Sequence, residues 1–356
     1  MTVSVSLSRP GVCCPVGFSA AAAAAALQAG ISGMVELPHL DRLARPIAGG
    51  YVQELDDGFS RRERVIELLA NAVADSLATP VPPGASQQPL PLLVATSEPG
   101  RPGGWSERDG GLIDALERRL QIRFHPTLSR VFAEGHVGGP RALAAARALL
   151  ESRAAGGCLV AGVDSLVSVT TLGWLQDTER LKTDSDSDGL LPGEAAAAVF
   201  VEPVLGGSAR RRAVSVEGIG FGVEPVHVLS DEPLLGAGIC AAASHALAEA
   251  GCALHDLDLR LSDLTGEAYG FREQALMMGR LIEQTREALP IWHPAQAIGD
   301  CGAAAGACQL AFATHLLAAR PERFIRVGLF NSAVGGARSV VVLRAPPAEP
   351  AARAKT

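Results

Sequence analysis

The sequence predicts a mixed α/β protein made of two repeated halves that stack around a shared layer of buried helices. Strand-like and helix-like segments alternate along the chain, which is typical of sheets covered by helices. The second part of the chain repeats the order of elements of the first. One Ala-rich helix in each part is apolar on nearly all sides, so it belongs between two layers and not at a surface.

The first half begins with an alternating strand over residues 2–7. The Ala-rich run 20–26 predicts a helix, because Ser19 is placed as an N-cap and Gly30 as a C-cap. The run lacks the basic leader of a signal peptide. The remaining elements expected in this half are a helix over 62–77, a strand over 90–96, the buried helix 142–150, and closing strands over 158–162 and 196–201.

The second half starts after a Gly- and Arg-rich turn at 206–212. Its expected elements are a strand over 213–218, a helix over 235–250, a strand over 257–261, the buried helix 303–318, and closing strands over 326–330 and 339–343. Each half therefore reads βαβαββ, and two copies predict a five-layered α-β-α-β-α sandwich. We place the halves at 1–208 and 209–347, with a flexible tail rich in Pro and Ala at 348–356.

Charge and composition exclude several classes of partner. The chain has 356 residues and a formal net charge of −7, so neither nucleic acid nor an anionic membrane is an expected partner. The basic run Arg210–Arg212 is interpreted as a solvated turn. No apolar stretch of the sequence is long and uninterrupted enough to span a membrane.

The seven cysteines indicate a reducing compartment, and we expect a cytoplasmic protein. Their number is odd, their spacing is scattered, and no Cys-x-x-Cys or Cys/His pattern suggests structural zinc. Asp184, Asp186 and Asp188 resemble the start of a calcium loop, but its twelfth position is Ala195 and not glutamate. We therefore interpret this segment as an acidic surface loop and expect neither a metal nor another cofactor.

Four segments carry a resemblance to a known family. Residues 11–17 precede a helix, 162–165 read Gly-Val-Asp-Ser, 188–195 read Asp-Gly-Leu-Leu-Pro-Gly-Glu-Ala, and 331–336 begin with Asn-Ser and end with Gly-Gly. They resemble the N-terminal segment and the "GGV", "DGFVLGEGA" and "NSFGFGG" motifs of β-ketoacyl synthases, which are condensing enzymes of the thiolase-fold superfamily. The resemblance covers nearly the whole chain, although residues 31–130 match weakly. It implies a thiolase-like fold.

The same resemblance implies where condensing residues would lie. Family members use a cysteine at the N-terminus of the first buried helix, where the helix dipole stabilises a thiolate. They also use two histidines and a lysine from the second half. Counting back from Gly162 places the nucleophile position at His136, and no cysteine lies between Cys14 and Cys158.

The other three positions are also changed. Asp263 stands in place of the first histidine, Asp300 in place of the second, and Ala295 in place of the lysine. The loop that bears the family's gating phenylalanine is shortened at 331–336. We therefore expect no catalytic residues of the condensing type in this chain.

Two interpretations of the changed site remain open. In the first, Cys301 is a nucleophile activated by its helix N-terminus and by His136, in a new Cys/His/Asp set. In the second, Asp300 is the N-cap of the helix from Ala303, Cys301 is a small packed residue, and a neutral His136 fills the vacated pocket. Phe271, Met277 and Met278, on a helix after Asp263, are expected to be core residues.

These features favour a catalytically inactive ketoacyl-synthase-like protein that acts as a protein-binding scaffold, chaperone or accessory subunit, including one for a bacterial secretion effector. A second hypothesis is a partner of an active synthase, similar to the chain-length factors of polyketide synthesis. A third is a divergent acyl transferase or hydrolase that uses Cys301. The expected partners are a second copy or a related thiolase-fold subunit, together with a protein client or an acyl carrier protein.

Overall fold

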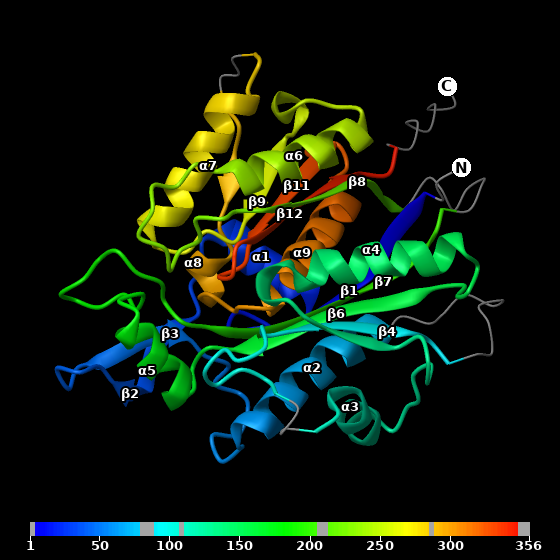
Figure 1. Ribbon diagram of the computed structural model, residues 1–356. Coiled ribbons are helices and arrows are strands. Elements are labelled where there is room, and N and C mark those ends of the chain that lie inside the picture. Colours follow the sequence, from blue (N-terminus) through cyan, green and yellow to red (C-terminus); the bar gives the residue numbers. More distant parts are fainter. Residues whose placement is uncertain (1–3, 79–88, 107–109, 205–212, 285–287, 348–356) are drawn as a thin grey trace, which may run out of the picture.

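The structure is a computed structural model that describes residues 4–78, 89–106, 110–204, 213–284 and 288–347 (Figure 1). Several sequence predictions lie outside these residues. They are the start of the opening strand, the basic run at 210–212, the boundary between the halves at 208 and 209, and the tail at 348–356.

The strands of the first half form one edge-to-edge series in the order β1-β7-β6-β4-β5. β1 is antiparallel to β7, β7 is antiparallel to β6, and β4 runs parallel to both β6 and β5. Their bounds are β1 (Val5–Cys13), β4 (Leu92–Thr96), β5 (Arg130–Ala133), β6 (Cys158–Ser165) and β7 (Glu194–Pro203).

The second half repeats this topology in the order β8-β12-β11-β9-β10, with the same strand directions. Its strands are β8 (Val214–Val223), β9 (Leu259–Ser262), β10 (Ile291–Trp292), β11 (Arg326–Ser332) and β12 (Ala337–Arg344). A short pairing of β1 with β8, at Ser6 and Leu7, joins the two series into one ten-stranded sheet within the described residues. The repeat is thus confirmed, and each half adds a short edge strand, β5 or β10, to the expected order.

The helices lie in three layers around these strands, as Figure 1 shows. α2 (Arg61–Leu77) and α3 (Leu112–Leu120) cover the outside of the first half, and α6 (Ala237–Ala250) and α7 (Ala268–Leu281) cover the outside of the second. α4 (Gly138–Glu151) and α9 (Ala304–Ala319) lie between the halves, where α1 (Ala20–Ala29) packs against α9.

The central helices touch by their backbones. A Cβ added to Gly139 of α4 would lie 2.8 Å from the amide nitrogen of Ala307, and one added to Gly306 of α9 would lie 2.7 Å from the carbonyl oxygen of His136. α9 is buried on nearly all sides, as its apolar composition predicted. The N-terminal ends of the two buried helices are therefore brought together.

The predicted caps of α1 are confirmed. Ser19 Oγ accepts a hydrogen bond from the backbone N–H of Ala22, and Gly30 adopts a left-handed φ of 68°.

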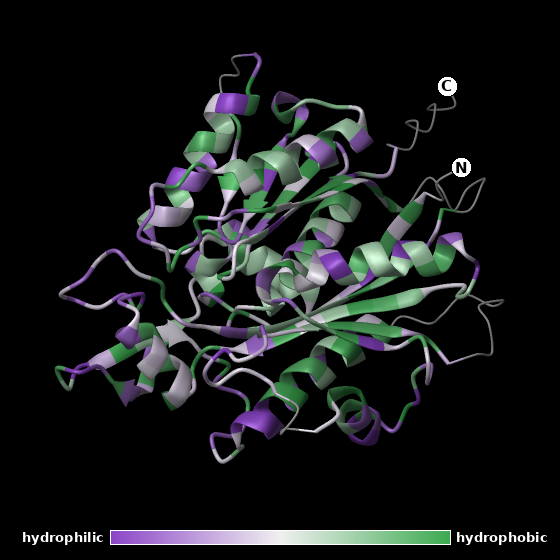
Figure 2. Cartoon of the chain, in the orientation of Figure 1, coloured by the Kyte–Doolittle hydropathy of each residue, from purple (hydrophilic) through white to green (hydrophobic). Residues whose placement is uncertain are grey.

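A cap structure beside the first half was not predicted from the sequence. It consists of the hairpin β2 (Met34–Leu40) and β3 (Pro46–Gly50) together with α5 (Val169–Asp177), around a small apolar cluster. In Figure 2 the central strands and α9 carry hydrophobic colours, whereas this hairpin carries more hydrophilic ones. In the part of the chain that the structure describes, no helix has the length and apolar character needed to cross a membrane.

Candidate functional site

An ion pair joins the N-terminal ends of the two buried helices. His136 lies in a single 3-10 turn, Gly135–Val137, that leads into α4, and Asp300 lies in the loop before α9. The His136 Nε2 atom is 2.9 Å from Asp300 Oδ1. Both residues are buried, with 6% and 5% of their surface exposed. Two of the residues that the sequence singled out, one from each half, are therefore in direct contact.

The pair is held in its charged form. Burial disfavours an imidazolium, but the Asp300 carboxylate outweighs burial and raises the pKa of His136 to about 10. Burial likewise disfavours the Asp300 carboxylate, but His136 and the backbone N–H of Gly302 outweigh it and lower the pKa of Asp300 to about 2. The expectation of a neutral His136 is thus wrong, because the Asp300 carboxylate outweighs the cost of burying the charged imidazolium.

Asp263 lies beside this pair. Its Oδ2 accepts a hydrogen bond of 2.7 Å from the backbone N–H of Ser332, at the end of β11. Burial raises the pKa of Asp263 to about 6, while the charge of His136 and the Ser332 N–H oppose that shift. His136, Asp263 and Asp300 line a cavity of about 50 Å³.

Two buried arginines complete the wall of this cavity. Arg180 binds Glu267 with both ends of its guanidinium group, at 2.7 and 2.8 Å. Arg338 donates to Glu273 at 2.7 Å and to the Tyr269 hydroxyl at 2.8 Å. Sequence reasoning did not find these pairs, because each joins residues more than 60 positions apart.

The structure was compared with known proteins. No protein-family profile matches the sequence, and no curated protein matches it. Solved structures do match. The ishigamide ketosynthase/chain length factor superposes with a TM-score of 0.78 and 17% identity, over 97% of this chain and 100% of that chain. The AntDE:AntF complex, a type II polyketide synthase acyl-carrier protein with its ketosynthase, superposes with a TM-score of 0.77 and 14% identity, over 97% and 100% of the two chains.

A third match is the ketosynthase ApeO in complex with its chain length factor ApeC from Xenorhabdus doucetiae, with a TM-score of 0.71 and 14% identity over 96% of this chain and 98% of that chain. The chain has a thiolase-like fold. These identities are low, so the likeness establishes the fold alone.

A second cavity is bordered by Ala295 and Cys301. It measures about 10 Å³, enough for at most one water molecule. Cys301 is only 3% exposed, and a hydrogen bond with the Cys308 thiol together with burial raises its pKa well above the usual value. The structure thus brings Ala295, Asp300 and Cys301 together around a space that holds no substrate-sized group.

The first turn of α9 is capped differently from the prediction. Asp300 Oδ1 accepts from the N–H of Gly302 at 2.9 Å, but the N–H of Ala303 donates to Asp164 Oδ2 at 3.0 Å. The helix begins at Ala304. Asp164 comes from β6 and is paired with Arg101. The expectation that Asp300 is the N-cap of this helix is therefore wrong, because Ala303 holds the cap position and Asp300 accepts from Gly302 before the helix begins.

The motif residues that resemble the ketoacyl synthase pattern have structural contacts. Glu194 is fully buried and accepts hydrogen bonds from Arg64 of α2, from the Ser165 hydroxyl and from the N–H of Val52. Asp188 Oδ1 accepts from the N–H of Ala268 at 2.6 Å. Asp188 therefore fixes the acidic loop to the start of α7.

The three residues after Asp263 that were expected in the core differ in burial. Met277 is fully buried and Met278 partly so, but Phe271 is 46% exposed and stacks edge-on against His293. The expectation that Phe271 is a core residue is wrong, because it lies on the outer face of α7.

In the described ranges, no cluster of three or more His, Cys, Asp or Glu side chains is arranged to hold a metal ion.

Proposed function

We propose that this chain is a non-catalytic, ketosynthase-like protein that works by binding another protein, as a scaffold, chaperone or accessory subunit. The observation that carries the proposal is the buried ion pair between His136 and Asp300, at positions where condensing chemistry needs a thiolate and a histidine. A protonated imidazole is neither a nucleophile nor a base. The pair supports a role in fixing the two halves together.

The space around the pair also argues against an acyl substrate. The cavities beside His136 and Cys301 measure about 50 and about 10 Å³. Sites for small-molecule substrates are typically of the order of 300 Å³ or more. Two ion pairs, Arg180 with Glu267 and Arg338 with Glu273, occupy the wall of the larger cavity. Opening this wall would leave buried charges without partners, which is energetically costly.

A thiolase-fold subunit is the partner that the fold supports best. Subunits of this fold are usually dimers whose sheets join across the interface. At one edge of the sheet lies β5, where Val131 is 39% exposed. Unpaired strand edges are ready to pair with another chain. We therefore propose that β5 contacts a second copy or a related subunit.

A chain-length-factor-like role is the second candidate, as a non-catalytic partner of an active ketosynthase. It is favoured by the similarity to complexes of a ketosynthase with its chain length factor or its acyl-carrier protein. Co-expression with a ketosynthase encoded near this chain would distinguish it from a chaperone. Formation of a stable one-to-one complex supports the accessory subunit, whereas capture of a secreted effector supports the chaperone.

The decisive experiment for partner binding is affinity purification of the tagged chain from a native lysate, followed by mass spectrometry. We expect a stoichiometric protein partner that survives washing at high salt. A chain that elutes alone, and that turns over acyl thioesters when purified, would contradict the proposal.

The alternative enzyme that uses Cys301 has a separate test. Iodoacetamide should label Cys240 and Cys252, which are partly exposed, in the native protein, and should reach Cys301 only after denaturation. The measurement is peptide mass spectrometry at matched labelling times. Labelling or acylation of native Cys301 at the rate of the two exposed cysteines would favour the acyl transferase.

A further inference from the structure

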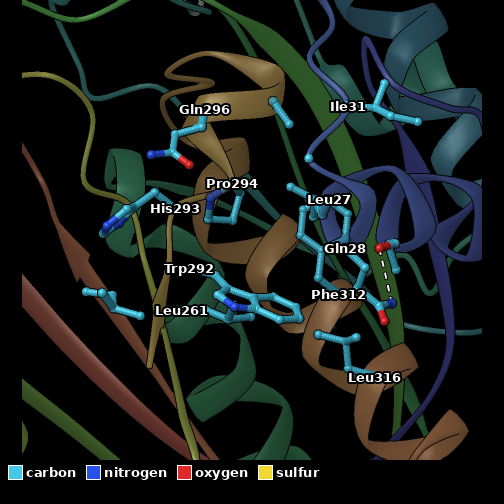
Figure 3. Close-up of a pocket in the computed structure, with 14 residues that line it drawn as sticks. Leu27, Gln28, Ile31, Leu261, Trp292, His293, Pro294, Gln296, Phe312 and Leu316 are labelled. Carbon is cyan, nitrogen blue, oxygen red and sulfur yellow. Dashed lines mark hydrogen bonds between the residues drawn. The ribbon is translucent and has the colours of Figure 1, made fainter. Parts of the chain in front are cut away.

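A half-open recess borders the central layer, away from His136, Asp263 and Asp300. It measures about 220 Å³ and is bordered by α1, the β9–β10 edge and α9, as Figure 3 shows. The one-turn helix α8 (Ala295–Ile298), together with Pro294, separates it from the cavity beside Cys301. The recess is therefore a site of its own, and an inference about it does not depend on the proposed function.

The walls of the recess are apolar and partly aromatic. Leu261, Phe312 and Leu316 on its inner side belong to the central hydrophobic core, and Trp292 and Leu27 face them (Figure 3). Trp292 is fixed from behind by an edge-on contact with Phe324, with ring centres 5.8 Å apart. A cavity of about 150 Å³ lined by Leu, Ile and Phe is known to bind benzene. A space of this size and lining thus suits a single aromatic ring.

The polar groups around the recess are uncharged. Gln28 donates through Nε2 to the carbonyl oxygen of Ala24 at 3.2 Å, and its Oε1 accepts no hydrogen bond from the described residues. Burial, together with the charge of Arg260, lowers the pKa of His293, so this side chain is neutral at neutral pH. No Asp, Glu, Lys or Arg lines the recess. An ion would lose its hydration there without gaining a partner.

We propose that the recess between α1, β10 and α9 binds a small neutral aromatic molecule that carries one hydroxyl group. The ring lies between Trp292, Phe312 and Leu27, and the hydroxyl donates a hydrogen bond to Gln28 Oε1. A carboxylate on the same ring is excluded, because the walls offer no cation. Such a ligand would link α1 of the first half to β10 of the second.

The test uses p-cresol, toluene and p-toluate as probes on the full chain, with Trp emission and isothermal calorimetry as readouts. We expect saturable binding of p-cresol, weaker binding of toluene and no binding of p-toluate. Ala24→Leu fills the recess from a buried position of α1 and should weaken p-cresol binding at least tenfold. Ala25→Leu, on the exposed face of the same helix, is the matched control and should leave binding unchanged.

Gln28→Leu supplies a variant that leaves the core intact. It should weaken p-cresol binding roughly tenfold, as expected for one hydrogen bond, and leave toluene binding unchanged. The proposal is overturned if p-cresol does not bind saturably to the wild type, if p-toluate binds equally well, or if both alanine variants weaken binding to the same extent. It is also overturned if a protein partner, and none of the probes, protects Trp292 from acrylamide quenching.

Discussion

The contact between His136 and Asp300 depends on the opposite charges of the two side chains. Because Asp300 raises the pKa of His136, the stabilisation from the imidazolium is complete below the ordinary histidine pKa and is lost as the pH rises through about 10. Because His136 lowers the pKa of Asp300, the stabilisation from the carboxylate is complete above its ordinary pKa and is lost as the pH falls through about 2. The pair is therefore fully charged across the neutral range.

Removing one partner of this pair should be costly. We expect His136→Gln and Asp300→Asn each to lower the free energy of unfolding by about 3 kcal/mol, since each leaves a buried charge alone. The double variant should lose much less than the sum of the two, because two neutral side chains can still share a hydrogen bond. Urea unfolding at neutral pH measures this coupling. Strictly additive losses would show that the pair contributes no interaction energy.

Asp263 should give the protein an unusual pH dependence. Its pKa of about 6 in the folded chain lies above its ordinary value of 3.8, so its contribution to stability is complete below about pH 4 and is lost as the pH rises through about 6. Asp263→Asn removes this loss, so the variant should gain about 3 kcal/mol on the wild type between pH 4 and pH 7. Denaturant midpoints at several pH values test this. A constant difference between the two proteins would contradict the assignment.

For single residues, the sequence indicated which positions come together better than which side chains they contact. Counting along the motifs singled out His136, Asp263 and Asp300, and in the structure all three line one cavity. The charge of His136 was predicted wrongly and those of the two aspartates were not predicted, since a pKa depends on neighbours that only the fold supplies. The arginine pairs at the cavity wall were missed for the same reason, because local spacing gives no signal for a pairing across the chain.

Glycines at the crossing of α4 and α9 set how closely these helices pack. Gly139→Ala should destabilise the protein by about 1–3 kcal/mol, because its Cβ would lie 2.8 Å from a backbone atom of α9. Gly173→Ala, in the middle of α5, is the matched control. A Cβ there meets nothing within 4 Å, so the same substitution should stabilise the protein by about 0.5–1 kcal/mol. Thermal unfolding measures the change in stability of each variant, and two changes of the same sign would contradict the packing argument.

Among the elements, the two long helices α2 and α9 were predicted well from sequence, whereas the short edge strands were not predicted. α2 agrees with its predicted bounds because its apolar spacing is clear, and α9 agrees to within one residue at each end because it is long and apolar on nearly all sides. The amphipathic helix α3 was missed. β5 and β10 have four and two residues, which is too short for a periodic signal. The β2–β3 hairpin was missed because it packs against α5 and not on the main sheet.

For the whole molecule, the exposed edge of the sheet predicts where a partner binds. Val131→Asp on β5 should abolish dimerisation or weaken partner binding at least tenfold, because it places a carboxylate in an interface of joined strands. Val223→Asp is the control, at a valine that is 70% exposed at the end of β8. Light scattering and quantitative pull-down measure the two variants. An equal effect of both substitutions would exclude β5 as the contact.

The fold as a whole could be predicted from the sequence, because the repeat and the apolar helix α9 both pointed to a layered arrangement. The expectation that the first buried helix is apolar on nearly all sides is wrong, because α4 carries Arg141 and Arg147 on a partly exposed face. The pairing that joins the two sheets could not be predicted from the sequence. It rests on the pairing of Ser6 and Leu7 with Ser215 and Val214, and nothing in those four residues marks them as neighbours.

The position of α9 in the chain has a consequence for synthesis on the ribosome. Both halves pack against this helix, yet Ala304–Ala319 follows every helix and strand of the first half along the chain. Until this helix has been translated, the inner apolar face of the first half is covered only in part, by α1 and α4. We therefore expect the nascent chain to expose apolar surface that is prone to aggregation until α9 has left the exit tunnel and the native core can close.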